Sequence, residues 1–107
     1  MERRDWYCED VLSRKIDVKK IWEDERVLVF YHPTPSTQHH AVIIPKKHIR
    51  SIMDAAATDG ALLSSMVSGV QKAVLAMGLE QAGFYVRTNA LAAGVTPHMH
   101  WHVHEFE

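Results

Sequence analysis

Toward its C-terminal end the chain has a histidine at every second position, in the segment Pro97-His98-Met99-His100-Trp101-His102-Val103-His104. Side chains two residues apart on a β-strand point to the same face, so an extended segment would align four imidazoles and turn Met99, Trp101 and Val103 the other way. A helix would scatter the same histidines around its axis. The spacing therefore predicts a half-buried strand over 98–104, with an imidazole face and an apolar face.

Imidazole has an ordinary pKa of about 6.5, so it can act near neutral pH as a nucleophile, base, acid or metal ligand. A row of four on one face leaves three interpretations open. The row could be a metal site. It could handle phosphate, with one imidazole attacking phosphorus while its neighbours stabilise oxyanions or transfer protons. It could also be no more than a solvent-facing polar edge.

Length and composition restrict these alternatives. The 107 residues, 47% of them hydrophobic, suit a single domain over 1–107 with one core. Acidic and basic residues number 13 and 12, so no broad basic field is available for nucleic acid, and any phosphate must be held locally. No apolar run reaches a membrane span or a signal-peptide core, which predicts a cytoplasmic protein without a membrane partner. Cys8 is the single cysteine, which excludes an internal disulfide, and we expect it to be a small buried hydrophobe.

Hydrophobic periodicity predicts seven elements in the order helix, strand, strand, strand, helix, strand, strand. Thr58 or Asp59 is expected to cap the long helix and Gly78 to end it. Such a chain should fold as an α+β domain, a five-stranded, mainly antiparallel sheet with one long helix and a short N-terminal helix. The expected helices cover 5–14 and 58–77, and the expected strands cover 16–22, 26–31, 40–44, 83–89 and the histidine segment.

Together these residues resemble the histidine-triad (HIT) family of nucleotide-binding proteins, whose signature is His-x-His-x-His followed by apolar residues. Residues 22–30 are similar to its first strands, residues 40–49 to its central strand and turn, and Asn89 to an asparagine upstream of the triad. Triad spacing could begin at His98 or two residues later. The first register keeps an apolar residue after the triad, whereas the second puts Glu105 there, so the triad is identified as His98, His100 and His102, with His104 as an extra.

The resemblance implies a hydrolase or nucleotidyl transferase that cleaves at the α-phosphorus of a purine nucleotide through a covalent nucleotidyl-histidine. His100 would be the nucleophile, with its far ring nitrogen held by a backbone carbonyl. His102 would bind phosphate oxygens and help protonate the leaving group. The further site residues that the resemblance implies are His98 and His40 as supporting histidines, Asn89 and Thr96 as phosphate contacts, and His32 and Phe30 as nucleotide contacts.

Two positions depart from the family pattern. Some members bind a structural zinc through a residue matching His48 and an N-terminal cysteine pair. Here residues 5–9 contain one cysteine, so we expect no metal, unless Asp5 or Glu9 supplies a hard ligand. Members also commonly have Asp or Asn after the first core strand to bind the ribose hydroxyls. His32 has that position here, and an imidazole cannot accept two hydrogen bonds, so ribose affinity or nucleoside preference should differ.

The leading hypothesis is an enzyme without a cofactor that acts on nucleoside phosphoramidates, adenylated amines or dinucleoside polyphosphates. The alternative is a non-catalytic nucleotide-binding or interaction module of the same fold. A third hypothesis is metal-dependent use of the histidine row. The resemblance also implies a homodimer in which two sheets join edge to edge.

Overall fold

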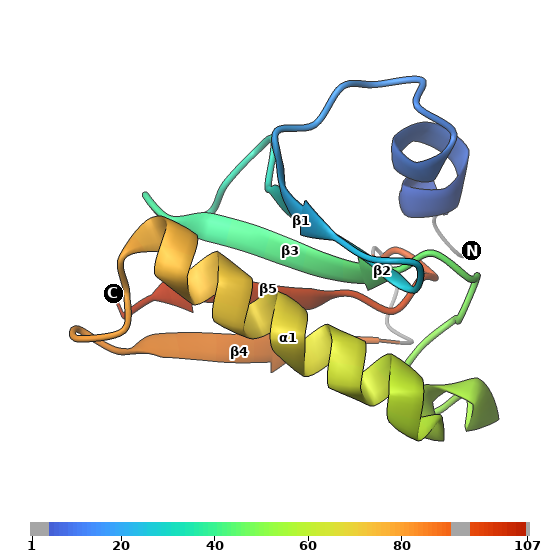
Figure 1. The fold of residues 1–107 in the computed structure, drawn as a ribbon. Helices are drawn as coiled ribbons and strands as arrows, with labels where there is room; N and C mark the ends of the chain where they lie inside the picture. Colours follow the sequence, from blue (N-terminus) through green and yellow to red (C-terminus); the bar gives the residue numbers. More distant parts are fainter. Residues whose placement is uncertain (1–4, 91–94, 107) are drawn as a thin grey trace.

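The computed structural model describes residues 5–90 and 95–106, and these contain the predicted elements in the predicted order. Figure 1 shows them along the chain. The sequence did not predict η2, a single 3-10 turn before the long helix. The elements are η1 (Tyr7–Leu12), β1 (Lys20–Glu23), β2 (Val27–Tyr31), β3 (His40–Pro45), η2 (Ala55–Thr58), α1 (Gly60–Met77), β4 (Phe84–Thr88) and β5 (Trp101–Glu105).

The five strands form one antiparallel sheet in the order β1-β2-β3-β5-β4. β3 therefore lies at the centre, beside β5, as Figure 1 shows. In this register His40 is opposite His104 and Val42 is opposite His102. The pairing brings a histidine of the central strand next to the histidines of the last strand.

β5 begins three residues later than the histidine spacing predicted, at Trp101 rather than at His98. The last pair of the β3–β5 ladder is Ile43 with Trp101, and two residues later Pro45 has no N–H to donate to a neighbouring strand. The carbonyl oxygen of Pro45 instead accepts a hydrogen bond from Nε2 of His98 at 2.8 Å. His98 and His100 thus precede the strand, in a segment held partly by side-chain hydrogen bonds.

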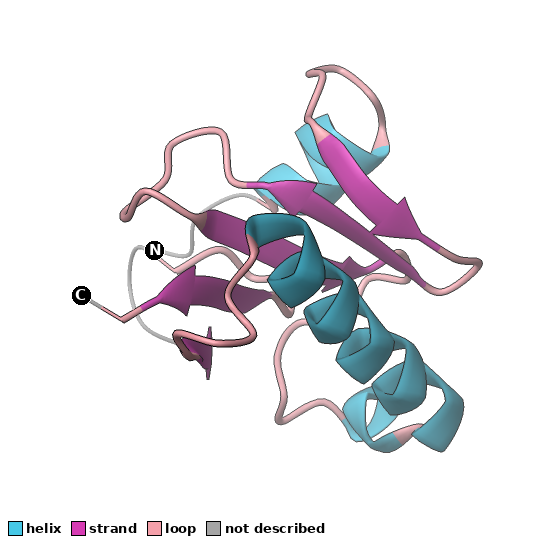
Figure 2. Cartoon of the chain, turned by 60° about the vertical axis from the view of Figure 1, so that its left-hand side comes forward, coloured by secondary structure: helices cyan, strands magenta, loops and turns pink. Residues whose placement is uncertain are grey.

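α1 covers one face of the sheet, as Figure 2 shows. Asp59 caps its first turn by accepting from the N–H of Leu62 at 3.0 Å, and Gly78 ends it in a left-handed conformation, φ 69°, as the sequence predicted. α1 is long and apolar enough to span a membrane by length and composition, but its buried residues pack on the sheet, as those of a core helix do. Met99, Trp101 and Val103 lie on this side, which confirms their predicted direction.

Gly69 explains how closely α1 approaches the sheet. A Cβ at this position would lie 2.9 Å from Cγ2 of Val29 and 3.1 Å from Cγ2 of Ile43. An internal glycine destabilises a helix by about 1 kcal/mol relative to alanine, but here it permits this close contact. The glycine is therefore a packing residue.

The opposite face of the sheet carries the histidines and is partly covered by η1. Tyr7 and Val11 of η1 pack against Phe30, Val42 and Ile44 in a second apolar cluster. The rest of this face, on the side of β5, is where His40, His100 and His102 gather. The candidate site thus lies beside η1, across the sheet from α1.

Candidate active site

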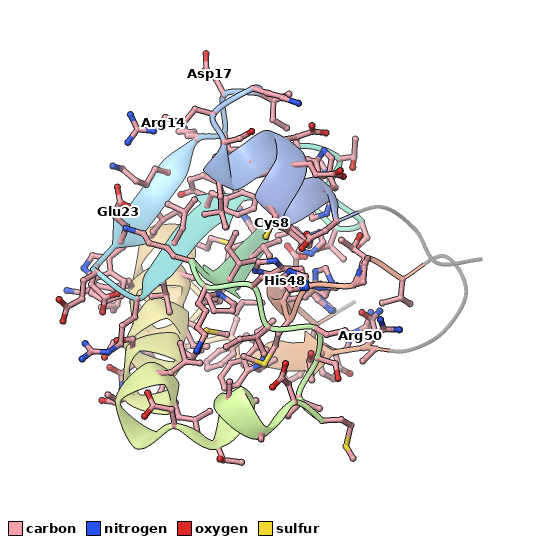
Figure 3. All side chains as sticks on the ribbon, turned by 90° about the vertical axis from the view of Figure 1, so that its right-hand side faces the viewer. Cys8, Arg14, Asp17, Glu23, His48 and Arg50 are labelled. Carbon is pink, nitrogen blue, oxygen red and sulfur yellow. The ribbon has the colours of Figure 1, made fainter. Side chains whose placement is uncertain are left out.

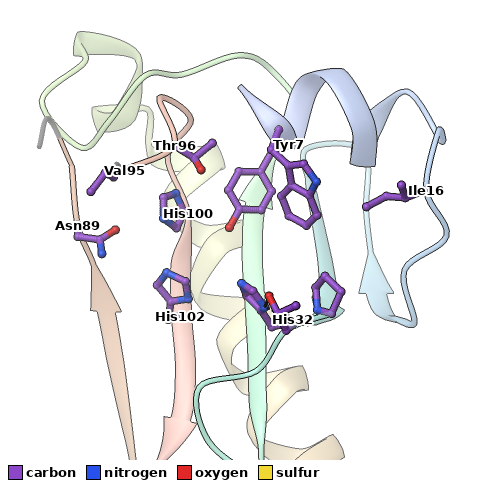
Figure 4. Close-up of a pocket in the computed structure, with 11 residues that line it drawn as sticks. Tyr7, Ile16, His32, Asn89, Val95, Thr96, His100 and His102 are labelled. Atoms are coloured by element: carbon purple, nitrogen blue, oxygen red, sulfur yellow. Dashed lines mark hydrogen bonds between the residues drawn. The ribbon is translucent and has the colours of Figure 1, made fainter. Parts of the chain in front are cut away.

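A cavity of about 540 Å³ opens on the histidine face, between η1, the end of β2 and the segment before β5. Figure 4 shows it with its lining side chains. Five predicted site residues line it, and they come from four separate parts of the chain: His32, Asn89, Thr96, His100 and His102. The fold thus assembles in one place most of the residues that the sequence analysis selected.

His100 is held in one tautomer by the backbone. Its Nδ1 donates a hydrogen bond to the carbonyl oxygen of His98 at 2.6 Å. A carbonyl can only accept, so Nδ1 carries the proton and Nε2 of the neutral ring carries the lone pair. The side chain is 4% exposed, and its ring centre lies 5.0 Å from that of Tyr7. The geometry presents a nucleophilic nitrogen in a fixed orientation.

His40 and His102 form a directed hydrogen-bond chain. The backbone N–H of Ser36 donates to Nδ1 of His40 at 3.2 Å, which places the proton of the neutral His40 ring on Nε2. That Nε2–H donates to Nδ1 of His102 at 2.8 Å. The proton of His102 is consequently on its own Nε2. Neighbouring imidazoles in the cavity therefore present opposite groups, a lone pair on His100 and an N–H on His102.

Burial keeps both members of this chain neutral. It lowers the pKa of His102 to about 3, assisted by the positive charge that His100 and His40 would carry. It lowers the pKa of His40 to about 4, assisted by His32 and His104. Near pH 7 the tautomers derived above are accordingly those of uncharged rings.

His32 follows β2 and is fixed by contacts on two sides. Its ring stacks on that of His40, with centres 4.5 Å apart and planes 11° apart. Its Nδ1 accepts from the backbone N–H of Thr34 at 3.0 Å. Burial lowers the pKa of His32, with a smaller contribution from His100. The neutral ring thus offers an Nε2–H donor.

Three predicted site residues do not line the cavity: His40 lies behind His102, His98 is described below, and Phe30 lies in the core. Phe30 is fully buried in the apolar cluster beneath η1, with its ring 6.3 Å from that of Tyr7, and is not among the described residues that line the cavity. His104 is 1% exposed, although it was expected to be an extra residue at the strand end. It is buried because it lies opposite both His40 and Tyr85, one on each neighbouring strand. Its Nδ1 donates to the carbonyl of Glu105 at 2.9 Å.

His98 faces a different group of side chains, beneath the first turn of η1. Its Nε2–H donates to the Pro45 carbonyl, so the Nδ1 of a neutral ring has no proton. This nitrogen lies 2.9 Å from Oδ2 of Asp5 and 3.2 Å from Sγ of Cys8. A lone pair so close to a carboxylate requires a proton or a cation between them.

The residues of this group fit a metal ion. Asp5, Cys8, His48 and His98 each offer one ligand atom, and these atoms all lie within 4.8 Å of one another. Figure 3 shows Cys8 and His48 close together at the edge of η1. Oxygen, sulfur and nitrogen in a set of four suit tetrahedral Zn²⁺, and the Pro45 carbonyl orients one ligand ring from behind. From sequence no metal was expected for want of a second cysteine; Asp5 supplies a carboxylate three residues before Cys8. A bound cation would fasten η1 to the histidine segment.

Sequence reasoning missed the contribution of η1 to the cavity. Trp6, Tyr7 and Ile16 line it, and the rings of Trp6 and His32 stack with centres 6.5 Å apart. The adjacent aromatic residues were visible in an amphipathic segment. Nothing in the local pattern showed which face of the sheet that segment would cover.

Comparison with known proteins agrees with this architecture. The HIT domain family matches residues 13–104. An uncharacterised HIT-like protein of Helicobacter pylori is 32% identical over 97 residues, which cover 89% of this chain and 90% of the relative. A histidine triad protein of Clostridium difficile has a TM-score of 0.82 and 29% identity, covering all of this chain and 95% of the other. A HIT family hydrolase of Legionella pneumophila has a TM-score of 0.79 and 29% identity, covering 91% and 88%. The chain therefore belongs to the HIT family and has the fold of its hydrolases.

Proposed function

We propose that this protein is a purine nucleotide hydrolase or nucleotidyl transferase that reacts at the α-phosphorus through a covalent nucleotidyl-histidine on His100. One observation carries the proposal. The 2.6 Å hydrogen bond from Nδ1 of His100 to the His98 carbonyl directs the ring's lone pair through Nε2. A neutral imidazole can attack phosphorus without first losing a proton.

In the first step Nε2 of His100 forms a bond to phosphorus while the bond to the leaving group breaks. A bound phosphate anion favours a protonated imidazole beside it, so in the complex His102 gains the proton that it passes to the leaving group. In the second step water attacks phosphorus, the P–N bond breaks and neutral His102 takes the proton from water. His100 is then neutral again, and His102 carries one proton as in the substrate complex, which it releases to solvent when the phosphate product leaves.

The rest of the cavity supports a nucleotide ligand. Asn89 and Thr96 offer an amide and a hydroxyl near His100, as phosphate oxygens require. Trp6, Ile16 and Pro33 provide an apolar wall of the kind that suits a purine base. Phosphoramidates, adenylated amines and dinucleoside polyphosphates all carry an α-phosphorus with a leaving group, and they form the proposed substrate class.

The test is hydrolysis of adenosine phosphoramidate, followed as AMP release, together with mass spectrometry of the acid-quenched protein. We expect turnover and a nucleotidyl adduct mapped to His100, both abolished in His100→Ala. His39→Ala is the matched control, because His39 is outside the cavity. Undiminished turnover in His100→Ala would refute the nucleophile. AMP binding without an adduct or turnover would favour the non-catalytic binding module.

A further inference from the structure

We infer that the cavity offers the ribose hydroxyls no carboxylate acceptor and binds 2′-deoxynucleotides about as tightly as ribonucleotides, with His32 as the residue that determines this. The inference rests on the proposed function. It specifies that the purine nucleotide substrate can carry either ribose or 2′-deoxyribose.

The first support is the chemistry of the cavity wall. No carboxylate is among the described residues that line the cavity, and the intervening sequence 91–94 contains no acidic residue. Figure 4 shows His100, His102 and Asn89 on one side and His32 with Ile16 on the other. The polar groups of the first side are those assigned to phosphate. The sugar is left with His32 and with the neutral hydroxyls of Thr34 and Tyr7.

The second support is the fixed orientation of His32. Its Nδ1 already accepts from the Thr34 N–H, and the Thr34 hydroxyl lies 3.4 Å from the same nitrogen. One face of the ring is stacked on His40. Turning the His32 ring would break these contacts. The ring therefore offers the sugar only its Nε2–H group. This group donates a hydrogen bond and cannot accept one.

A single donor distinguishes sugars poorly. It can donate to the 2′ oxygen, the 3′ oxygen or the ring oxygen of ribose, so loss of one hydroxyl leaves other acceptors. A carboxylate differs, because its two oxygens accept from both hydroxyls of a vicinal diol. A site built to bond a substrate hydroxyl rejects the analogue that lacks it, and a site without that group does not.

The experiment is calorimetric titration with AMP, 2′-deoxy-AMP and 3′-deoxy-AMP. For the wild type we expect dissociation constants within about threefold of one another, since no buried acceptor is left unpaired by the deoxy sugar. His32→Asp should prefer AMP by about tenfold or more, because a charged acceptor makes the stronger hydrogen bonds. His32→Leu is the control, because its side chain has neither a charge nor a hydrogen-bond acceptor, and it should stay near the wild-type ratio.

Each outcome decides the inference. A wild-type preference for AMP above tenfold would overturn it and leave the proposed chemistry intact. Equal binding of the nucleotides without any hydrolysis would support it while overturning the proposed catalysis. If no nucleotide binds, both fall. An unchanged ratio in a folded His32→Asp variant would remove His32 as the determinant, and the wild-type ratios are informative even if that variant fails to fold.

Discussion

Nε2 of His40 lies 2.8 Å from Nδ1 of His102, and the two rings belong to adjacent strands of the sheet. The contact sets the tautomer of His102 from behind, so that its Nε2–H faces the cavity. One imidazole thus orients another through a hydrogen bond. His40 is accordingly a positioning residue, since it acts through His102.

Removal of His40 should lower kcat more than it raises KM. In His40→Ala, Nδ1 of His102 loses its donor, and we expect kcat for adenosine phosphoramidate to fall about 10- to 100-fold, the range found for residues that orient a metal-ligating histidine. His40→Gln can donate from its amide and should recover part of the loss. His39→Ala, one residue away, should leave kcat unchanged. Equal losses in His40→Gln and His40→Ala would argue against the orienting hydrogen bond.

Acid should weaken the fold before the carboxylates titrate. The pKa values of His40 and His102, about 4 and 3, lie below the ordinary value of about 6.5. Between the lowered pKa values and about 6.5, the unfolded chain binds more protons than the folded one. The contribution of these histidines to the free energy of unfolding is therefore fully present above pH 6.5 and decreases as the pH drops. Urea unfolding at pH 7, 6 and 5 measures this. His40→Gln should reduce the dependence by about one proton, and an identical slope would refute the assignment.

Zn²⁺ should stabilise the protein through Asp5, Cys8, His48 and His98. Burial and the neighbouring Asp5 raise the pKa of Cys8 to about 12, so binding must displace a thiol proton and should strengthen as pH rises. At a hundredfold excess over the dissociation constant, the gain is about 2.7 kcal/mol. Calorimetric melting with and without chelator, and metal analysis of the dialysed protein, provide the readouts.

Variants of the same turn test the assignment of the ligands. Asp5→Ala should weaken zinc binding, and Asp5→Cys should tighten it, because a second thiolate suits Zn²⁺. Glu9→Ala should have no effect, since Glu9 is adjacent to Cys8 but outside the group of four. Absence of both bound metal and a zinc-dependent change in melting would exclude the site.

Gly69→Ala should destabilise the fold although alanine favours helix. The new methyl would meet the side chains of Val29 and Ile43 at 2.9 and 3.1 Å, and β-branched strand residues have little rotamer freedom to move aside. Overpacking costs about 1–3 kcal/mol, which exceeds the gain in helix propensity of about 1 kcal/mol. Gly60→Ala is the control, because nothing lies within 4 Å of its added Cβ. Urea unfolding of both variants measures the difference.

The free edge of β4 is the surface that we propose for the homodimer. β4 ends the strand order, and Val86 on it is 45% exposed. An unpaired apolar edge favours pairing with a second strand, and a charge placed there opposes it. Val86→Lys should therefore convert a dimer to a monomer in light scattering, whereas Met53→Lys, at an exposed position away from the sheet, should not. A monomeric wild type would contradict the proposal.

The sequence predicted the fold where periodicity was strong, and it selected five of the residues that line the cavity. Alternation gave the faces of β5, and the caps of α1 followed from Asp59 and Gly78. Local spacing could not separate His98 from His100, although one ring faces Asp5 and Cys8 and the other faces the cavity. That division depends on Pro45, whose carbonyl oxygen accepts a hydrogen bond from the His98 ring. The local spacing of residues in a sequence does not reveal long-range contacts of this kind.

Four consecutive residues at the start of η1 and just before it contribute to both sites. Asp5 and Cys8 belong to the candidate metal-ligand group, while Trp6 and Tyr7 line the cavity proposed for the nucleotide. A short segment exchanged between related proteins would therefore alter cation preference and nucleoside affinity together.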